Sequence, residues 1–298
     1  MEPPPAWQLA AAFAAIYFIW GSTFLAIRYA IESIPVFLMA GTRFVTAGAF
    51  LYLWRRLGHK EKPGRVHWAG AALVGALLFM GGNGAVVWSE QRVASGLTAL
   101  MQAAIPLWMV LLDARRKRGA PLTGRVIAGV ILGIAGIAVL LPPSELLGGG
   151  RVDLLGAAVL VAGSFCWASG SLVSRQVKQP PSPGLAAGMQ MMMGGLVLLA
   201  AGAASGELSR LDLSAMTPRA VFCLGYLIVF GSVISFTAYT WLLAVTTPAR
   251  VSTYAYVNPI VAVLLGWLVA SEPLTPRTLL ATAVIVTAVA MIISARTR

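Results

Sequence analysis

Ten long apolar stretches constrain the fold of this 298-residue chain more than any other feature. An α-helix crosses a hydrocarbon core about 30 Å thick with roughly 20 apolar residues, and each stretch has about this length. None alternates between apolar and polar residues as membrane β-strands do. The sequence therefore predicts an all-α polytopic membrane protein with ten transmembrane helices, over residues 7–27, 35–54, 67–88, 94–112, 126–141, 154–174, 184–204, 220–243, 251–270 and 278–295.

Composition excludes a soluble protein. Charged residues make up 11% of the chain and hydrophobic residues 58%, whereas a soluble domain carries about 25% charged residues. The first stretch follows Glu2 and three prolines rather than a basic segment, which predicts a retained helix and not a cleaved signal peptide. Cys166 and Cys223 lie inside apolar stretches, without a CxxC pair, and are expected to be packed thiols.

The net charge of +12 is unevenly distributed along the chain. Fifteen basic residues fall on one predicted side of the membrane: Arg55, Arg56, Lys60, Lys62, Arg65, Arg115, Arg116, Lys117, Arg118, Arg125, Arg175, Lys178, Arg250, Arg296 and Arg298. Six fall on the other: Arg28, Arg92, Arg151, Arg210, Arg219 and Arg277. The positive-inside rule places the first side and both termini in the cytoplasm, in a bacterial-type inner membrane. The charge thus reports topology, and no nucleic-acid partner is expected.

The chain repeats itself once. Three pairs of fragments match in order: residues 20–28 with 167–175, Pro106 with Pro259, and residues 121–125 with 273–277. This predicts two halves, residues 1–145 and 146–298, with five helices each. Because five is an odd number, the second half enters the membrane from the opposite side. Two inverted five-helix repeats (5+5) are typical of secondary transporters that work by alternating access.

Several motifs resemble one family along essentially the whole chain. They are IWGSTFLAIR (19–28), AGTRF (40–44), GNG with a following Glu (82–90), and YAYVNPIVAVLLG (254–266) followed by EPLT (272–275). These resemble the EamA-type members of the drug/metabolite transporter superfamily, and within it the YedA-type inner-membrane exporters. The resemblance implies a ten-helix inverted-repeat fold that exports small metabolites, often amino acids or drugs, from the cytoplasm.

Arg43 is the one charged residue inside the predicted helices, apart from residues at their ends. A charge at this depth normally faces a cavity or a partner. Two interpretations stay open. Arg43 either attracts a substrate carboxylate, or it has a structural role, bonding backbone carbonyls or Glu90.

Other polar and aromatic residues are candidates for a substrate site near mid-membrane. Small amphipathic ligands favour aromatic walls with a few polar groups, which selects Trp20, Ser22, Asn83, Gln102, Trp167, Gln190, Tyr254 and Asn258. The alternatives are ordinary aromatic packing, hydroxyls bonded to their own helix, and an Asn83 that satisfies a broken helical turn. Pro106 and Pro259 each remove a backbone hydrogen bond and predict either hinges or static bends.

The sequence thus predicts a transporter rather than an enzyme. No Asp or Glu lies at the centre of a predicted helix, which favours facilitated diffusion, or coupling through a residue at a helix end such as Glu90. No catalytic residue, metal site or cofactor is expected. The expected partners are a small-molecule substrate and the lipid bilayer, with the protein a monomer or a homodimer. A membrane metabolite sensor and an intramembrane lipid-modifying enzyme on the same scaffold are the alternatives.

Overall fold

The computed structural model describes residues 5–58, 62–115, 123–140, 153–180, 182–246 and 248–294. Across these residues every regular element is a helix and no strand occurs. Several predicted features lie outside the described residues: the boundary between residues 145 and 146, residues 121 and 122 of the repeated fragment, and the basic residues Lys60, Arg116, Lys117, Arg118, Arg151, Arg296 and Arg298.

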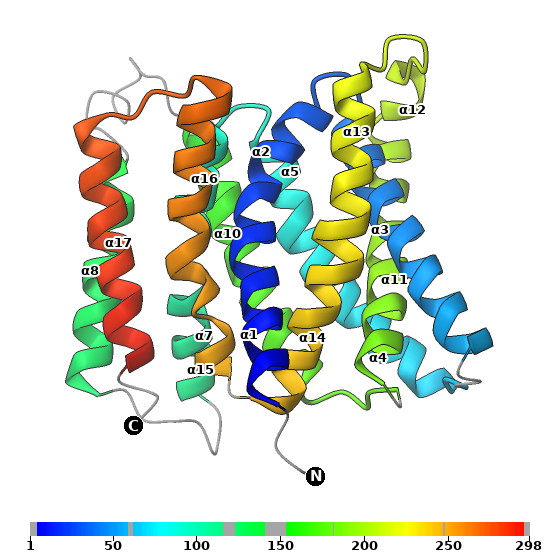
Figure 1. Ribbon diagram of the computed structural model, residues 1–298, viewed down its shortest axis with the longest axis horizontal. Helices are drawn as coiled ribbons and strands as arrows, with labels where there is room; N and C mark the ends of the chain where they lie inside the picture. The colour runs from blue at the N-terminus through cyan, green and yellow to red at the C-terminus, as the bar shows by residue number, and fades with distance from the viewer. Residues whose placement is uncertain are drawn as a thin grey trace.

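The helices stand side by side in one bundle (Figure 1). In chain order the elements, with π-helical segments marked η, are α1 (Ala6–Ala14), η1 (Ala15–Ile19), α2 (Trp20–Ala30), α3 (Val36–Leu53), η2 (Trp54–Gly58), α4 (Arg65–Gly75), η3 (Ala76–Gly84), α5 (Ala85–Ser89), α6 (Ser95–Gln102), α7 (Ile105–Ala114), α8 (Gly124–Leu140), α10 (Leu154–Ser174), α11 (Pro183–Ala204), α12 (Glu207–Arg210), α13 (Pro218–Tyr226), η4 (Leu227–Ile234), α14 (Ser235–Val245), α15 (Pro248–Val251), α16 (Tyr254–Ala270) and α17 (Pro276–Ser294).

Seven helical runs in the described residues are long and apolar enough to cross a membrane: Ala6–Ala30, Val36–Gly58, Arg65–Ser89, Ser95–Ala114, Leu154–Ser174, Pro183–Ala204 and Pro218–Val245. Each coincides with a predicted stretch, so the all-helical polytopic prediction is confirmed. The shorter apolar helices α8, α16 and α17 lie where the fifth, ninth and tenth spans are predicted. The count of ten spans stays a prediction.

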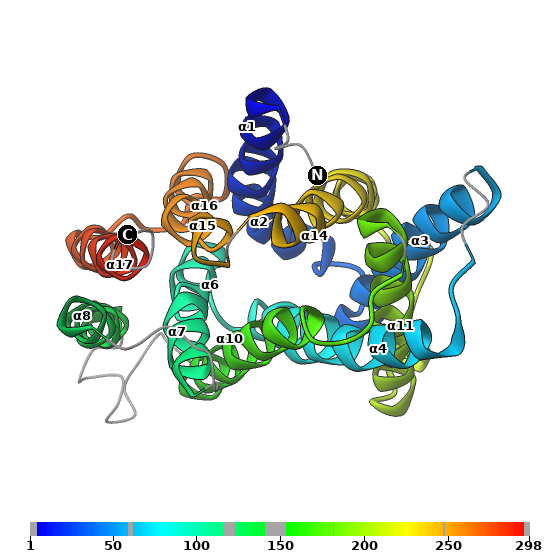
Figure 2. The ribbon, with the colours of Figure 1, turned by 90° about the horizontal axis from the view of Figure 1, so that it is seen from below.

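Helices far apart in the sequence are neighbours in the bundle. The helix α3 packs along α11, and α8 packs along α17 at one edge (Figures 1 and 2). The helices α2 and α16 also touch, and a Cβ atom added at Gly21 would lie 2.7 Å from Cβ of Val261. Only glycine therefore allows this close approach. The start of α1 and the end of α17 lie at the same end of the bundle, called here the lower end after its place in Figure 1.

At the upper end, two acidic side chains cap helices that are distant in the sequence. Glu207 Oε2 accepts hydrogen bonds from two backbone N–H groups at the start of α3, those of Phe37 (3.0 Å) and Leu38 (2.9 Å). The Glu272 carboxylate does the same at the start of α6. The first N–H groups of a helix have no intrahelical partner, so these acids stabilise the helix ends.

Replacing Glu207 with alanine leaves these two N–H groups unpaired in a buried site. We expect a loss of about 1–3 kcal/mol in stability, seen as a lower melting temperature of the purified protein in detergent. Glu207→Gln keeps an acceptor oxygen and should lose less. Glu32→Ala removes only an exposed ion pair with Arg219 and serves as the control. A Glu207→Ala protein with the same melting temperature as the wild type would contradict the capping role.

Candidate functional site

A cavity with about 720 Å³ of empty space lies among the helices, toward the upper end. Its lining includes Ile27 and Val86, near the upper ends of α2 and α5. Seven of the nine predicted substrate-binding residues line this cavity: Trp20, Arg43, Asn83, Gln102, Trp167, Tyr254 and Asn258. They come from α2, α3, η3, α6, α10 and α16. The structure therefore brings together residues that lie more than 200 positions apart in the sequence.

The other two predicted residues lie elsewhere. The Ser22 hydroxyl donates to the carbonyl of Ile19 at 2.7 Å and lies 2.6 Å from the hydroxyl of Tyr226. Gln190 lines a second cavity, with about 930 Å³ of empty space, toward the lower end. There its amide donates to the side-chain oxygen of Gln179 at 3.4 Å. Neither residue lines the first cavity, and substrate binding by either of them stays a prediction.

Aromatic rings form a layer between the two cavities. The rings of Trp20 and Trp167 meet edge to face with centroids 5.7 Å apart, and Trp20 meets Tyr254 in the same way at 5.3 Å. Tyr239 lies 5.0 Å from Trp20 and lines the second cavity. Of its four ring neighbours, Trp20, Trp167 and Tyr254 line the first cavity and Phe236 lines both. These rings thus lie between the upper cavity and the lower one.

Arg43 lines the first cavity although its side chain is buried. Its Nε donates to the Ser232 hydroxyl at 2.8 Å, and the guanidinium lies over the Phe44 ring, 4.5 Å from the centroid. A Cβ atom at Gly231 would come within 2.9 Å of Nη2, so glycine leaves room for the guanidinium. In the part of the chain that the structure describes, Nη1 has no hydrogen-bond partner.

Three amide side chains line the same cavity but differ in their bonding. Asn83 donates to the carbonyl of Leu78 at 3.5 Å, within its own π-helical segment. With its nitrogen turned toward η1, the orientation that its neighbours favour, Asn258 donates to the carbonyls of Tyr17 (2.8 Å) and Ile16 (3.0 Å). Gln102 Oε1 has no partner within the described ranges. Buried polar groups are rarely left unpaired, so Arg43 and Gln102 are among the cavity groups available to a ligand.

Together these groups define what the cavity can bind. Arg43 Nη1 offers a charged donor, Gln102 Oε1 offers an acceptor, and aromatic rings form the walls. This combination matches a small molecule with an anionic group, a donor and an apolar body. Within the described residues, no group of three or more His, Cys, Asp or Glu side chains could hold a metal ion.

Known proteins resemble this chain in sequence and in fold. A profile of the EamA-like transporter family matches residues 7–141 and again residues 154–294. The chain belongs to this family. The chain is 39% identical over 284 residues to the uncharacterized inner membrane transporter YedA of Escherichia coli K12, covering 94% of this chain and 89% of that protein.

Two more distant likenesses agree with this assignment. A protein named as a probable amino-acid metabolite efflux pump of Escherichia coli K12 is 27% identical over 162 residues, 53% of this chain and 50% of that protein. A crystal structure described only as that of a protein has a TM-score of 0.68 at 18% identity, with 99% of this chain and 100% of that chain covered. It shows the same fold. The resemblance found in the sequence is confirmed, and the chain is a membrane transporter of the EamA-like family.

The two predicted hinge prolines occupy different local settings. The helical run Ser95–Ala114 is interrupted at Ala103 and Ala104, and Pro106 lies in the first turn of α7 directly after this break. Pro259 lies inside α16, where it lines the first cavity. Both positions lack the backbone N–H of a regular helix. Motion about them stays a prediction.

Several cavity residues of this transporter are not singled out by the sequence. Phe44, Phe79 and Phe236 line the first cavity, and Ser232 holds Arg43. The phenylalanines sit in apolar stretches where lipid-facing and cavity-facing rings look alike. The pair Gly231-Ser232 is the one available signal, because a small and a polar residue together interrupt the otherwise apolar stretch of η4.

Proposed function

We propose that this transporter exports small metabolites, amino acids or drug-like compounds, from the cytoplasm by alternating access and facilitated diffusion. The observation that carries the proposal is the first cavity, where Arg43 and Gln102 keep unpaired polar atoms among aromatic walls. The relative named as a probable amino-acid metabolite efflux pump supports the substrate class. The lack of an acidic residue at the centre of any predicted helix supports diffusion down a gradient.

The proposed architecture is ten transmembrane helices in two inverted five-helix halves, residues 1–145 and 146–298. Two observations support it. The family profile matches the chain twice, and two of the helix pairs, α3 with α11 and α8 with α17, join the second and fifth predicted helix of one half to their counterparts in the other. A two-fold relation between the halves gives such pairs.

The proposed orientation places the lower end in the cytoplasm of a bacterial-type inner membrane, with both termini there. The described basic residues at the lower end outnumber those at the upper end: Arg55, Arg56, Lys62, Arg65, Arg115, Arg125, Arg175, Lys178 and Arg250 against Arg28, Arg92, Arg210, Arg219 and Arg277. This agrees with the positive-inside rule. YedA, the relative described above, is named as an inner membrane transporter.

In the proposed cycle, substrate enters from the cytoplasm through the second cavity and passes the aromatic layer. It then binds in the first cavity, with its anionic group on Arg43 and its donor on Gln102. Rocking of the two halves about Pro106 and Pro259 opens the outer side. The ligands are a small molecule and the surrounding lipid, and the protein acts as a monomer or a homodimer.

The test is flux into proteoliposomes of the purified protein, with a panel of amino acids and cationic drugs, with and without a pH gradient. We expect saturable flux of at least one panel member that follows its own gradient. Accumulation driven by the pH gradient would overturn facilitated diffusion. Ligand binding without flux of any member would favour a membrane metabolite sensor, and conversion of a lipid would favour an intramembrane enzyme.

A further inference from the structure

Glu90 is a buried carboxyl group that the proposed transport cycle does not use. It directly follows α5 and is 4% exposed. Neither of its carboxylate oxygens has a hydrogen-bond partner among the residues that the structure describes. A charged carboxylate buried without partners is far less favourable than the neutral acid.

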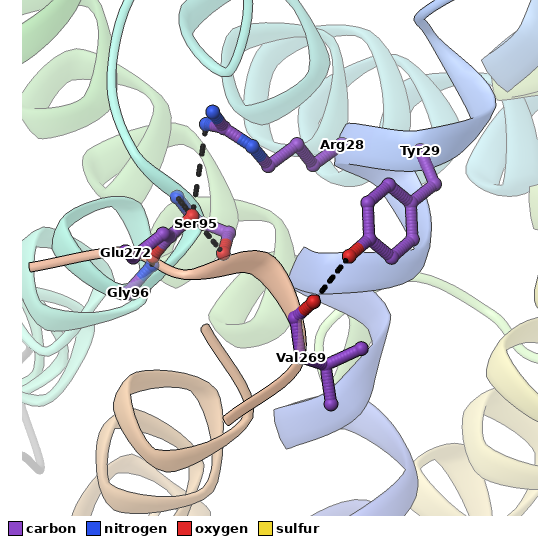
Figure 3. Close-up of polar contacts among 6 residues, drawn as sticks. All are labelled: Arg28, Tyr29, Ser95, Gly96, Val269 and Glu272. Atoms are coloured by element: carbon purple, nitrogen blue, oxygen red, sulfur yellow. Dashed lines mark hydrogen bonds and ion pairs between the residues drawn. The ribbon is translucent and has the colours of Figure 1, made fainter. Parts of the chain in front are cut away.

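Neighbouring acids at the same end of the bundle are well paired, unlike Glu90. The Glu272 carboxylate accepts from the backbone N–H of Ser95 (3.0 Å) and Gly96 (3.1 Å), and Arg28 lies 3.6 Å away (Figure 3). The burial of Glu90, one residue beyond the run Arg65–Ser89, raises its pKa well above the usual range. The charge of Glu272 raises this pKa further, while Arg28 and Arg43 oppose the rise.

Glu90 also lies next to the outer part of the first cavity. Its backbone N–H bonds the carbonyl of Val86 at 3.0 Å, so it continues the helical turn of a cavity-lining residue. Residues four apart share one helix face. The Glu90 carboxyl group interacts electrostatically with the Arg43 guanidinium, although no direct hydrogen bond joins them. Arg43 Nη1 thus has no hydrogen-bond partner among the described residues, while its charge and that of Glu90 act on each other.

We propose that Glu90 is a proton-controlled competitor for Arg43, which promotes release of an anionic substrate on the outer side. The proposal rests on the proposed function, in which Arg43 holds the substrate's anionic group. Neutral Glu90 leaves Arg43 to the substrate. When the outer side opens and water reaches Glu90, its O–H bond breaks and the proton passes to outer water. The resulting carboxylate attracts Arg43 and repels the substrate anion.

The proton returns from the same water when the site closes, so no proton crosses the membrane. The cycle stays facilitated diffusion, yet binding and release depend on the outer pH. The charged groups that act on Glu90 are Arg28 from α2, Arg43 from α3 and Glu272 after α16. In the proposal Glu90 is the member of this group that changes charge, because it is the buried carboxyl group without a hydrogen-bond partner among the described residues.

The experiment measures binding of benzenesulfonate to the full chain in lipid nanodiscs by calorimetry. This probe has an aromatic ring and an anionic group whose charge does not change between about pH 5.5 and about pH 8.5. We expect wild-type protein to bind it about tenfold more tightly at the acid pH, because the repulsion by ionised Glu90 is then lost. Glu90→Gln, a neutral mimic of the acid, should bind tightly at both pH values.

Three further variants make the result specific. Glu90→Asp should keep the pH dependence, and Glu32→Gln, which changes an exposed acid at the same end, should bind as the wild type does. Arg43→Gln should lose benzenesulfonate binding at both pH values. An infrared difference spectrum should show the C=O band of a protonated buried acid, missing from Glu90→Gln.

Each contrary result overturns the proposal. Wild-type binding that is absent or independent of pH contradicts it, as does pH dependence that persists in Glu90→Gln, or an infrared band unchanged in that variant. The proposed function fails separately. Proteoliposomes without flux, together with pH-dependent binding, would remove the transport function and keep the competition between Glu90 and the anion. Flux together with pH-independent binding would keep the transport function and remove the competition between Glu90 and the anion.

Discussion

Replacing Arg43 with glutamine is expected to lower the transport of carboxylate-bearing substrates by about ten- to a hundredfold, while cationic drugs are still transported. The reason is that Arg43 Nη1 is the unpaired charged donor in the first cavity. A hydrogen bond to a charged group contributes about 1.5–3 kcal/mol. The measurement is the initial rate of uptake into proteoliposomes, at equal amounts of folded protein, for both classes of substrate.

Two controls separate binding by Arg43 from a structural role. Ser232→Ala removes the hydroxyl that accepts from Arg43 Nε but keeps the charge, so acid transport should fall only a few fold. Arg43→Lys keeps a charge without the planar fork and should be intermediate. If Arg43→Gln lowers acid and cation transport alike, and lowers the melting temperature, then Arg43 stabilises the bundle instead of binding the substrate.

The helices are predictable from the sequence because lipid imposes one rule on every span. A backbone in hydrocarbon has to satisfy its own hydrogen bonds, so an apolar stretch of sufficient length predicts a helix whatever its neighbours are. Arg43 is predictable for a related reason, since a charge at that depth needs a cavity or a partner. Trp20 and Trp167 are predictable from the repeat, which marks them as equivalent positions.

The partner of each side chain is not predictable in the same way. Ser22 and Thr23 are adjacent hydroxyl residues, yet Ser22 meets Tyr226 while Thr23 lines the cavity. The direction in which each side chain leaves the helix decides which hydroxyl faces the cavity. A π-helical segment adds a residue to its turn, so η1 changes this direction for the residues that follow it. The sequence has no signal for this segment. For Asn258, likewise, the spacing shows the shared face with Tyr254 but not its bonds to η1.

The two cavities depend on side-chain packing alone, so the sequence does not predict the boundary between them. Tyr239 is 1% exposed, bonds the Ser171 hydroxyl at 2.7 Å, and lies between the second cavity and the rings that line the first. Tyr239→Ala should open a path between the cavities. A transporter with alternating access shows counterflow of labelled substrate, whereas an open path does not. We therefore expect counterflow to fall at least about tenfold, with stability lower by about 3–5 kcal/mol.

Two matched variants control for the lost ring and for the lost hydroxyl. Tyr239→Phe keeps the ring contacts and loses the bond to Ser171, so its counterflow should stay close to that of the wild type. Phe222→Ala removes an aromatic ring that is 75% exposed on the outside of the bundle and should also leave counterflow intact. Undiminished counterflow in folded Tyr239→Ala would mean that the aromatic layer does not separate the two sides. Tyr239 and Trp20 come from different predicted halves. The same result would therefore mean that the contact that changes during transport lies elsewhere between the two halves.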